Sequence, residues 1–471
     1  MRTAGNRTII LIVASLSSFL TPFMGSSVNI ALPAIGQEFS MNAIMLNWVS
    51  TSYLIATAVF LLPFGKAADI YGKKGIFING VVIFSLSSLL VAFSPSAGVL
   101  LSFRVLQGIG SAMIFGTGVA ILVAVYPPEE RGRALGINVA ATYFGLSLGP
   151  FIGGILTENF GWESIFLVTV PVGIIITALA SKGIGEEKAE PKKGGIDHAG
   201  ALIYSLSLIV IMYGFSRIPG LSGAVLIIAG AAGMALFLLW EKRTESPLLD
   251  IRLMTHNRPF AFSNLAAFIH YSATFAVTFL LSLYLQYIKA MSPQEAGLVL
   301  VSQPFVMTAF SPIAGRLSDR IEPRILASAG MAVTCLGLLL VAFLREDTGM
   351  GQILAALVLI GFGFAFFSSP NTNAIMSAVE KKMYGVASGM IATMRITGQM
   401  VSMGVALMLF AVFIGQHKIT PEIYPDFMKS LNTGFLIFSV LCAAGAFASL
   451  ARGRIHENGN STPRSADTDS G

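Results

Sequence analysis

The ten residues Gly65–Lys74, with the sequence GKAADIYGKK, form a short charged segment between two long apolar runs. A second segment of the same design, GRLSDRIEPR at Gly315–Arg324, also separates two apolar runs. In both copies an Asp follows the first Gly by four residues, and basic residues end the segment. A charged turn repeated in this way is typical of a membrane protein built from two related halves, each with the turn at the same place.

The composition indicates that the chain lies in a membrane. Of its 471 residues, 54% are hydrophobic and 11% are charged, and the mean hydropathy is +0.76. Soluble domains carry about 25% charged residues, so this chain lacks the charge to cover its surface in water. Its apolar runs of about 20 residues match the helix length that crosses a bilayer. The sequence therefore predicts an all-α integral membrane protein whose partner is the lipid bilayer.

The charged and cysteine residues argue against several other functions. The net charge of +6 comes from basic residues in short loops, so no nucleic-acid partner is expected. Cys335 and Cys442 lie inside apolar runs, and no disulfide framework or metal-ligand spacing is present. The sequence also has no recognisable nucleophile–base pair or phosphate-binding loop, so we expect neither an enzyme nor a cofactor or metal site.

The apolar runs predict fourteen transmembrane helices in groups of six, two and six. The predicted spans are Ile9–Ile30, Met45–Phe64, Ile76–Ser94, Val99–Val125, Ala134–Thr157, Ile165–Ser181, Ala199–Phe215, Leu221–Trp240, Phe260–Tyr287, Glu295–Ser311, Ile325–Leu344, Gln352–Asn371, Val386–Ile414 and Asn432–Leu450. The predicted domains are an N-terminal six-helix bundle (1–181), a cytoplasmic linker (182–198), an extra helix pair (199–240), a second cytoplasmic linker (241–259), a C-terminal six-helix bundle (260–451) and a disordered cytoplasmic tail (452–471).

The distribution of Lys and Arg predicts the orientation. Loops on one side of the fourteen spans hold 23 of these residues and loops on the other side hold five, while Arg104 and Arg395 lie inside spans. Cytoplasmic loops carry the excess of basic residues. Both termini are therefore expected in the cytoplasm, as an even number of spans requires.

Gly65 and Asp69 are expected where the second span meets the cytoplasm. A glycine there lets a neighbouring helix approach closely, and a carboxylate can lie against the positive N-terminal end of another helix. Such a contact would hold the cytoplasmic side shut and would break when that side opens. We call this contact the latch. A solvated turn with basic anchors is the alternative, and the second copy of the segment favours the latch.

Arg104 lies about six residues into the fourth predicted span. An arginine at the middle of a membrane costs about 2.5 kcal/mol or more unless it finds a partner or water. Its side chain either reaches outward to the membrane surface or faces a polar cavity, with Gln107 one turn away.

The fifth span carries Gly145, Gly149 and Gly153 at four-residue spacing, with Pro150 and Gly154 beside them. Glycines on one face allow tight helix contact, and a proline weakens the helix locally. Packing alone would explain the glycines, whereas the proline among them favours a seam that can bend.

These segments together resemble a known family. GKAADIYGKK resembles the cytoplasmic loop motif of the major facilitator superfamily, and FRVLQGIGSA (Phe103–Ala112) resembles its fourth-helix arginine motif. GLSLGPFIGG (Gly145–Gly154) is similar to its antiporter motif in the fifth helix. Three further segments resemble the fourteen-helix drug–proton antiporter branch, namely Ser26–Pro33, Leu283–Leu298 and Arg395–Leu407. The resemblance covers nearly the whole chain outside the linkers and the tail.

The resemblance implies two six-helix bundles that rock around a central cavity, with the extra helix pair at the periphery. Substrate would leave the cell in exchange for protons, as in multidrug efflux and drug resistance. Asp69 would then act in gating, Arg104 in proton coupling, and Gly145–Gly154 at the interface of the moving halves. Gating or coupling roles are also predicted for Gly65, Gly72, Asp319, Arg320 and His270.

The chain departs from this branch in the first helix. Aligning Val28–Pro33 places Met24 where the branch usually has an Asp, and no Asp or Glu lies near the middle of any predicted span. Proton antiport needs a group that takes up a proton on one side and releases it on the other, usually a buried carboxylate. His270 changes charge near neutral pH, although a lone membrane histidine is more often a packing residue. Asp69 is the other candidate, and the sequence does not choose between them.

Polar side chains that could line the central cavity are Asn29, Tyr53, Gln107, Tyr143, Tyr271, Gln303, Asn371, Asn373, Arg395 and Gln399. They include an arginine and no acid, so a neutral or anionic amphiphile fits as well as a lipophilic cation held by aromatic rings. We expect a monomeric, multi-pass exporter of amphipathic small molecules in the cytoplasmic membrane. One alternative is an exporter or importer of a specific metabolite, such as an organic anion, with different or no proton coupling. Another is a transporter-like sensor, which the lack of a sizeable soluble domain disfavours.

Overall fold

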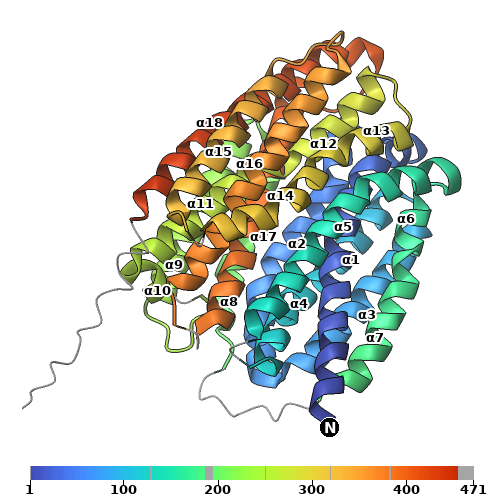
Figure 1. Cartoon of the computed structure of the whole chain (residues 1–471). Helices are drawn as coiled ribbons and strands as arrows, with labels where there is room; N and C mark the ends of the chain where they lie inside the picture. Colours follow the sequence, from blue (N-terminus) through green and yellow to red (C-terminus); the bar gives the residue numbers. More distant parts are fainter. Residues whose placement is uncertain are drawn as a thin grey trace, which may run out of the picture.

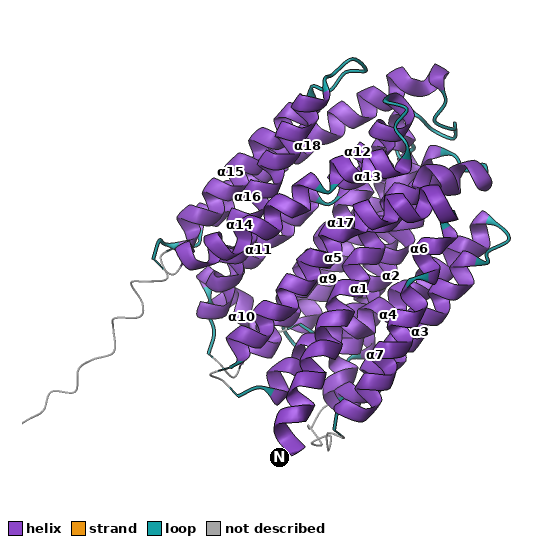
Figure 2. Ribbon diagram, turned by 45° about the vertical axis from the view of Figure 1, so that its right-hand side comes forward, coloured by secondary structure: helices purple, strands orange, loops and turns teal. Residues whose placement is uncertain are grey.

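The computed structural model describes residues 2–127, 130–185, 195–249, 251–318, 320–380 and 383–453. Within these ranges all regular structure is helical, as Figure 2 shows. Fourteen helical segments in the described ranges are long and apolar enough to cross a membrane. The predicted all-α membrane fold and its number of spans are therefore confirmed.

The first six spans form one bundle, drawn from blue to teal in Figure 1. In this bundle α1 packs against α5 and α7, and α4 packs against both α2 and α3. The sixth span consists of two consecutive helices, α6 and α7. The bounds are α1 (Arg2–Glu38), α2 (Ala43–Tyr71), α3 (Lys73–Ala92), α4 (Ala97–Val125), α5 (Arg131–Phe160), α6 (Glu163–Leu167) and α7 (Thr169–Gly183).

The last six spans form the second bundle, drawn from yellow to red in Figure 1. Here α16 packs against α14 and α15, while α11 packs against α17 and α18. The bounds are α11 (Arg258–Thr274), α12 (Ala276–Leu283), the π-helix η1 (Tyr284–Ile288), α13 (Pro293–Leu300), α14 (Ser302–Ser318), α15 (Pro323–Ala342), α16 (Met350–Ser377), α17 (Tyr384–Phe413), the short 3₁₀ helix η3 (Pro421–Ile423) and α18 (Tyr424–Ala451).

The extra helix pair lies against both bundles. Helix α8 (His198–Arg217) contacts α2 and α17, and α9 (Leu221–Glu241) packs mainly on α8. Large apolar side chains of α9, including Leu221, Val225 and Ile228, are exposed, which suits a helix covered by lipid. The segment after α9, expected as a charged linker, contains one short helix, α10 (Ile251–His256).

Several helices are longer than the apolar runs that predicted them. Helix α1 continues through Pro33 to Glu38, and α18 begins at Tyr424, eight residues before the predicted span. Hydropathy marks the part of a helix that suits hydrocarbon, whereas backbone hydrogen bonds continue the helix into the polar zone. The predicted ends therefore mark the hydrophobic core of each span rather than the ends of the helix.

The charged segment Gly65–Lys74 is mostly helix. Helix α2 continues to Tyr71, and α3 begins at Lys73, so the turn between them is the single residue Gly72. Gly72 has a φ of 97°, and its N–H donates to the carbonyl oxygen of Ala68 at 3.1 Å. Glycine takes this left-handed conformation without the steric cost of a Cβ. The segment therefore turns the chain by one residue rather than by a loop.

The two bundles meet directly at one end of the molecule. We call the end with the N-terminus and the α2–α3 turn the basic face, and the end with the α1–α2 turn the far face (Figure 1). At the far face the Ala43 N–H donates to the His417 carbonyl at 3.1 Å, across the two bundles. The Gln294 N–H donates to the Glu158 carboxylate at 3.0 Å. Direct contacts between the bundles therefore close the far face.

Glycines near the basic ends of α5 and α17 have no close neighbour. A Cβ added at Gly132 or Gly136 of α5, or at Gly385 or Gly389 of α17, would meet no atom within 4 Å. Glycines at helix contacts usually have a close neighbour. These four glycines therefore lie outside tight helix contacts.

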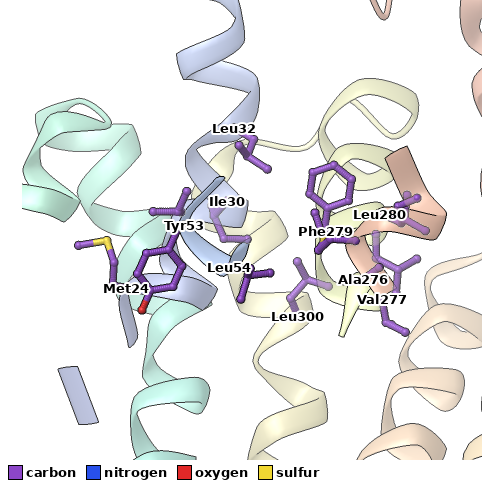
Figure 3. Packing of buried hydrophobic residues seen from close by; sticks show 14 of the residues in the cluster. Met24, Ile30, Leu32, Tyr53, Leu54, Ala276, Val277, Phe279, Leu280 and Leu300 are labelled. Carbon is purple, nitrogen blue, oxygen red and sulfur yellow. The ribbon is translucent and has the colours of Figure 1, made fainter. Parts of the chain in front are cut away.

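One apolar core contains residues of both bundles. Figure 3 shows part of it, with Ile30 and Leu54 from the first bundle and Phe279 and Leu300 from the second. Ile30 and Phe279 are fully buried. Because this cluster contains residues of both bundles, separating the bundles there would expose apolar surface.

Candidate functional site

A cavity of roughly 1030 Å³, counted with its opening, lies between the two bundles. Helices α1, α2, α4 and α5 line it on one side, and α11, α12, α14, α16 and α17 line it on the other. The lining residues are Thr21, Pro22, Gly25, Ser26, Asn29, Tyr53, Leu54, Phe115, Thr142, Tyr143, Leu146, Pro150, Tyr271, Thr274, Phe275, Thr278, Gln303, Pro304, Met307, Phe364, Arg395, Ile396 and Gln399.

Aromatic rings and uncharged polar groups dominate the wall of this cavity. Arg395 is the one lining residue with a formal charge, and no Asp or Glu is among the described residues of the wall. The Tyr143 and Ser368 hydroxyls are 2.5 Å apart, and those of Ser147 and Thr308 are 3.1 Å apart, so hydrogen bonds join α5 to the second bundle beside the cavity. The two hydroxyls of each pair would have to separate if the bundles rocked apart.

The predicted cavity residues fall into two groups. Those that line the cavity are Asn29, Tyr53, Tyr143, Tyr271, Gln303, Arg395 and Gln399. Three others lie elsewhere in the described structure and bond to protein groups. Gln107 donates to Ser88, Asn371 donates to the Ser263 carbonyl, and Asn373 donates to Ser318. These three amides join helices, because their side chains face neighbouring helices rather than the space between the bundles.

Arg104 is sealed inside the first bundle. Its side chain is 1% exposed, so in this state it does not reach the membrane surface. Its Nε donates to the Val49 carbonyl at 3.0 Å, and its Nη1 donates to Gln107. The guanidinium carbon lies 4.5 Å from the centre of the Tyr53 ring. Arg104 therefore lies behind Tyr53, which separates it from the cavity.

The glycines of the fifth span have two different partners. An added Cβ at Gly149 or Gly153 would approach Cβ atoms of α1 to 2.9 Å, and Gly145 also packs on α1, inside the same bundle. A Cβ at Gly154 would lie 2.5 Å from the Pro293 carbonyl oxygen of α13 in the other bundle. Across from it, Gly297 of α13 packs against the carbonyl of Pro150. Three glycines thus hold the first bundle together, and Gly154 lies at the seam between the halves.

His270 lies one layer behind the cavity wall. It is fully buried, and its ring centre is 4.1 Å from that of Phe367 and 4.9 Å from that of Phe364, which lines the cavity. Its Nδ1 is 4.0 Å from the Cys442 sulfur, and its Nε2 has no hydrogen-bond partner in the described structure. Among those residues no carboxylate is paired with the ring. This aromatic surrounding is what a packing residue would have.

Within the described residues, the predicted gating residues near the basic face do not form a latch. Asp69 is exposed and makes no hydrogen bond or ion pair within the described part of the chain. Gly65 lies close to α4, since a Cβ at Gly116 would be 3.2 Å from the Gly65 nitrogen. Arg320 is exposed, and Asp319 lies outside the described residues. The latch stays a prediction for the state in which the basic face closes.

Arg452, which the sequence analysis assigned to the tail, is fully buried at the end of α18. Its Nη1 donates to the Asn371 side-chain oxygen at 2.9 Å and to the Ser263 hydroxyl at 3.1 Å. Burial lowers the pKa of Arg452 to about 10, so the side chain stays charged near neutral pH. The low hydropathy after Leu450 hid this role. The rest of the predicted tail, from residue 454, lies outside the described residues.

Several cavity residues were missed in the sequence analysis. Thr21 and Gly25 of α1 line the cavity and lie eight and four residues before Asn29, which was predicted. This spacing places them on one face of a helix. A search for small and polar residues at helical spacing inside the first apolar run would have found this stripe. Phe115, Phe275 and Phe364 gave no such signal, because lipid-facing helices use phenylalanine equally.

Two helical bundles around a shared cavity have the architecture of a membrane transporter. The family model of the Major Facilitator Superfamily matches residues 14–199 and 264–469. The chain belongs to this superfamily, as its motifs predicted. The unmatched residues between these ranges include nearly all of α8 and the whole of α9 and α10.

Relatives in this superfamily differ in what their names say they carry. The chain is 32% identical to the riboflavin transporter RibZ of Clostridioides difficile (strain 630), over 82% of this chain and 84% of that protein. It is 30% identical to the multidrug resistance protein Stp of Mycobacterium tuberculosis (strain CDC 1551 / Oshkosh), over 87% of this chain and 77% of that protein. A crystal structure of a bacterial homologue of the human lysosomal transporter Spinster shares the fold, with a TM-score of 0.69 and 16% identity. The match covers 95% of this chain and 97% of that chain.

Proposed function

We propose that this protein is a secondary active exporter of amphipathic, drug-like small molecules that works by alternating access and proton antiport. The observation that carries the proposal is the cavity between the bundles, which combines aromatic rings with hydroxyl and amide groups. Such a wall suits molecules with an apolar body and a few polar groups. The names of RibZ and Stp, a vitamin carrier and a multidrug resistance protein, agree with cargo of this kind.

The arrangement of the bundles supports the alternating-access part of the proposal. We take residues 1–181 and 260–451 as the two moving bundles, residues 199–240 as a peripheral pair, and the basic face as cytoplasmic in the cell membrane. Substrate would enter through the basic face. That face would then close, with Asp69 as one part of its latch, while the Gly154–Pro293 seam at the far face separates.

A second candidate function is transport of one specific metabolite, including an organic anion, with different or no proton coupling. The charge of the cavity favours this candidate, since Arg395 lines it and no described Asp or Glu does. The position of His270 inside an aromatic cage also removes one proton carrier from the cavity wall. Coupling is thus the part of the proposal that most needs a direct measurement.

Purified protein in liposomes with an internal pH-sensitive dye tests the proposal. Under an imposed proton gradient, we expect compounds from a panel of lipophilic cations, neutral drugs and organic anions to move protons. This movement should be lost in Asp69→Asn and in Arg104→Ala and should persist in His270→Ala. Labelled compound that equilibrates across the membrane without proton movement would support the second candidate function. No movement of any compound, with folded protein, would contradict both.

A further inference from the structure

The cavity carries one unbalanced positive charge. Arg395 of α17 is half-buried in the cavity wall, and the other residues of that wall within the described chain are apolar, hydroxyl-bearing or amide-bearing. A charge in a membrane interior is costly unless it is paired or wet. The wall offers Arg395 no carboxylate, so a ligand or solvent has to supply the balancing groups.

The position of Arg395 leaves its donors available. Its guanidinium carbon lies 5.2 Å from the centre of the Phe115 ring, which belongs to α4 of the opposite bundle. A contact with a ring face uses no N–H donor in a hydrogen bond to a protein oxygen. In the described chain no hydrogen bond or ion pair involves the Arg395 side chain.

The other two buried arginines behave differently. Arg104 donates to the Val49 carbonyl and to Gln107, and Arg452 donates to Asn371 and Ser263. Both of them donate to groups of their own bundle, and Nε and Nη2 of Arg452 have no partner in the described structure. Arg395 instead presents a guanidinium, with five N–H donors, to a cavity that the two bundles share.

The rest of the wall fits the remainder of an amphipathic ligand. Aromatic rings from both bundles surround the space beside Arg395, and amide side chains lie among them. Flat apolar molecules pack against such rings, and planar anions such as carboxylates match the guanidinium fork. The aromatic residues are Tyr53, Phe115, Tyr143, Tyr271, Phe275 and Phe364.

We propose that the cavity selects amphipathic anions, with a carboxylate or sulfonate on Arg395 and a flat apolar body against the aromatic wall. This inference rests on the proposed function and names the charge of its substrate. The ligand and Arg395 together carry no net charge, so a loaded cavity is easier to close than an empty one. Binding and closure are thereby linked through one residue.

Three labelled probes that share a naphthalene ring test the charge preference. They are 2-naphthalenesulfonate, naphthalene-2-sulfonamide and 2-naphthylmethylammonium, and their binding is measured on purified protein in lipid nanodiscs. A charge-assisted hydrogen bond should make the sulfonate bind about tenfold tighter than the neutral sulfonamide. The ammonium probe should bind most weakly, because it meets an uncompensated positive charge.

Variants at Arg395 and at a control position test whether the preference for the sulfonate depends on this guanidinium. In Arg395→Gln, sulfonate affinity should fall about tenfold while sulfonamide affinity changes by less than about threefold. Arg395→Lys should keep part of the preference, since it keeps the charge without the planar fork. Arg217→Gln is the control, because exposed Arg217 also lies over an aromatic ring, that of Tyr213, and donates to its hydroxyl, but is on α8 outside the cavity.

The outcomes distinguish this inference from the function on which it rests. Equal or tighter binding of the sulfonamide or ammonium probe to the unmodified protein would overturn the anion preference and leave the exporter proposal intact. An unchanged preference in Arg395→Gln would also overturn it. Failure of all three probes to bind folded protein would contradict the cavity as a binding site, and with it both proposals.

Discussion

Replacing Gly154 by leucine is expected to force the far face open and to stop transport. A Cβ at this position would lie 2.5 Å from the Pro293 carbonyl oxygen and 2.9 Å from the Gln294 Cα, and both are backbone atoms of the other bundle. Backbone of a packed helix cannot yield locally, so α5 and α13 have to separate. Overpacking of this kind costs about 1–3 kcal/mol, which shifts a two-state equilibrium by about fivefold to about 150-fold.

Distances between spin labels at the far face measure this shift. Labels at Asn159 on α5 and Asp347 after α15, both exposed and in opposite bundles, should move apart in Gly154→Leu in a background without the two native cysteines. Gly98→Leu is the control, since Gly98 has no atom within 4 Å of an added Cβ. Unchanged distances together with normal transport would show that the Gly154 seam does not govern closure.

Replacing Arg104 by methionine is expected to abolish transport and to lower the thermal stability of the first bundle. The guanidinium joins α4 to α2 through Val49 and orients Gln107, which in turn donates to Ser88 of α3 at 2.6 Å. Methionine keeps much of the volume but leaves these buried acceptors without their donor. Each unsatisfied buried group costs about 1–3 kcal/mol.

The lysine variant makes this prediction specific. Arg104→Lys retains the charge, but an ammonium group cannot reproduce the fixed fork that contacts both Val49 and Gln107. We expect it to restore less than half of the lost thermal stability and little of the transport. Thermal unfolding in detergent and uptake by proteoliposomes are the measurements, with Arg217→Met as the exposed control. Normal transport in Arg104→Met would refute a coupling role for this residue.

Hydropathy along the chain was enough to predict the membrane class, the helical fold and the order of six, two and six spans. These features depend on how each segment partitions between water and hydrocarbon, which is a local property of its composition. The charged segment Gly65–Lys74 was also recognised as a turn, but only the structure shows that the turn is the single residue Gly72. The three motifs then predicted the superfamily that the family model matches.

Only the tertiary structure shows which of the residues named from the sequence contact one another. Four-residue spacing placed Gly145, Gly149 and Gly153 on one face of α5, but only the fold shows that this face contacts α1 while Gly154 contacts α13. Arg104 and Arg395 looked alike in sequence, since both interrupt apolar spans. The first is sealed behind Tyr53 and the second lines the cavity.

The difference has a physical reason. Whether a segment enters the membrane depends on its own residues, whereas a side chain's partner depends on helices that are distant in sequence and packed beside it. Asn371 illustrates this, because it meets Arg452 from a segment that hydropathy assigned to the tail. The sequence by itself determined how many helices cross the membrane and in what order. The packing of two bundles decided that one unpaired arginine faces the space between them.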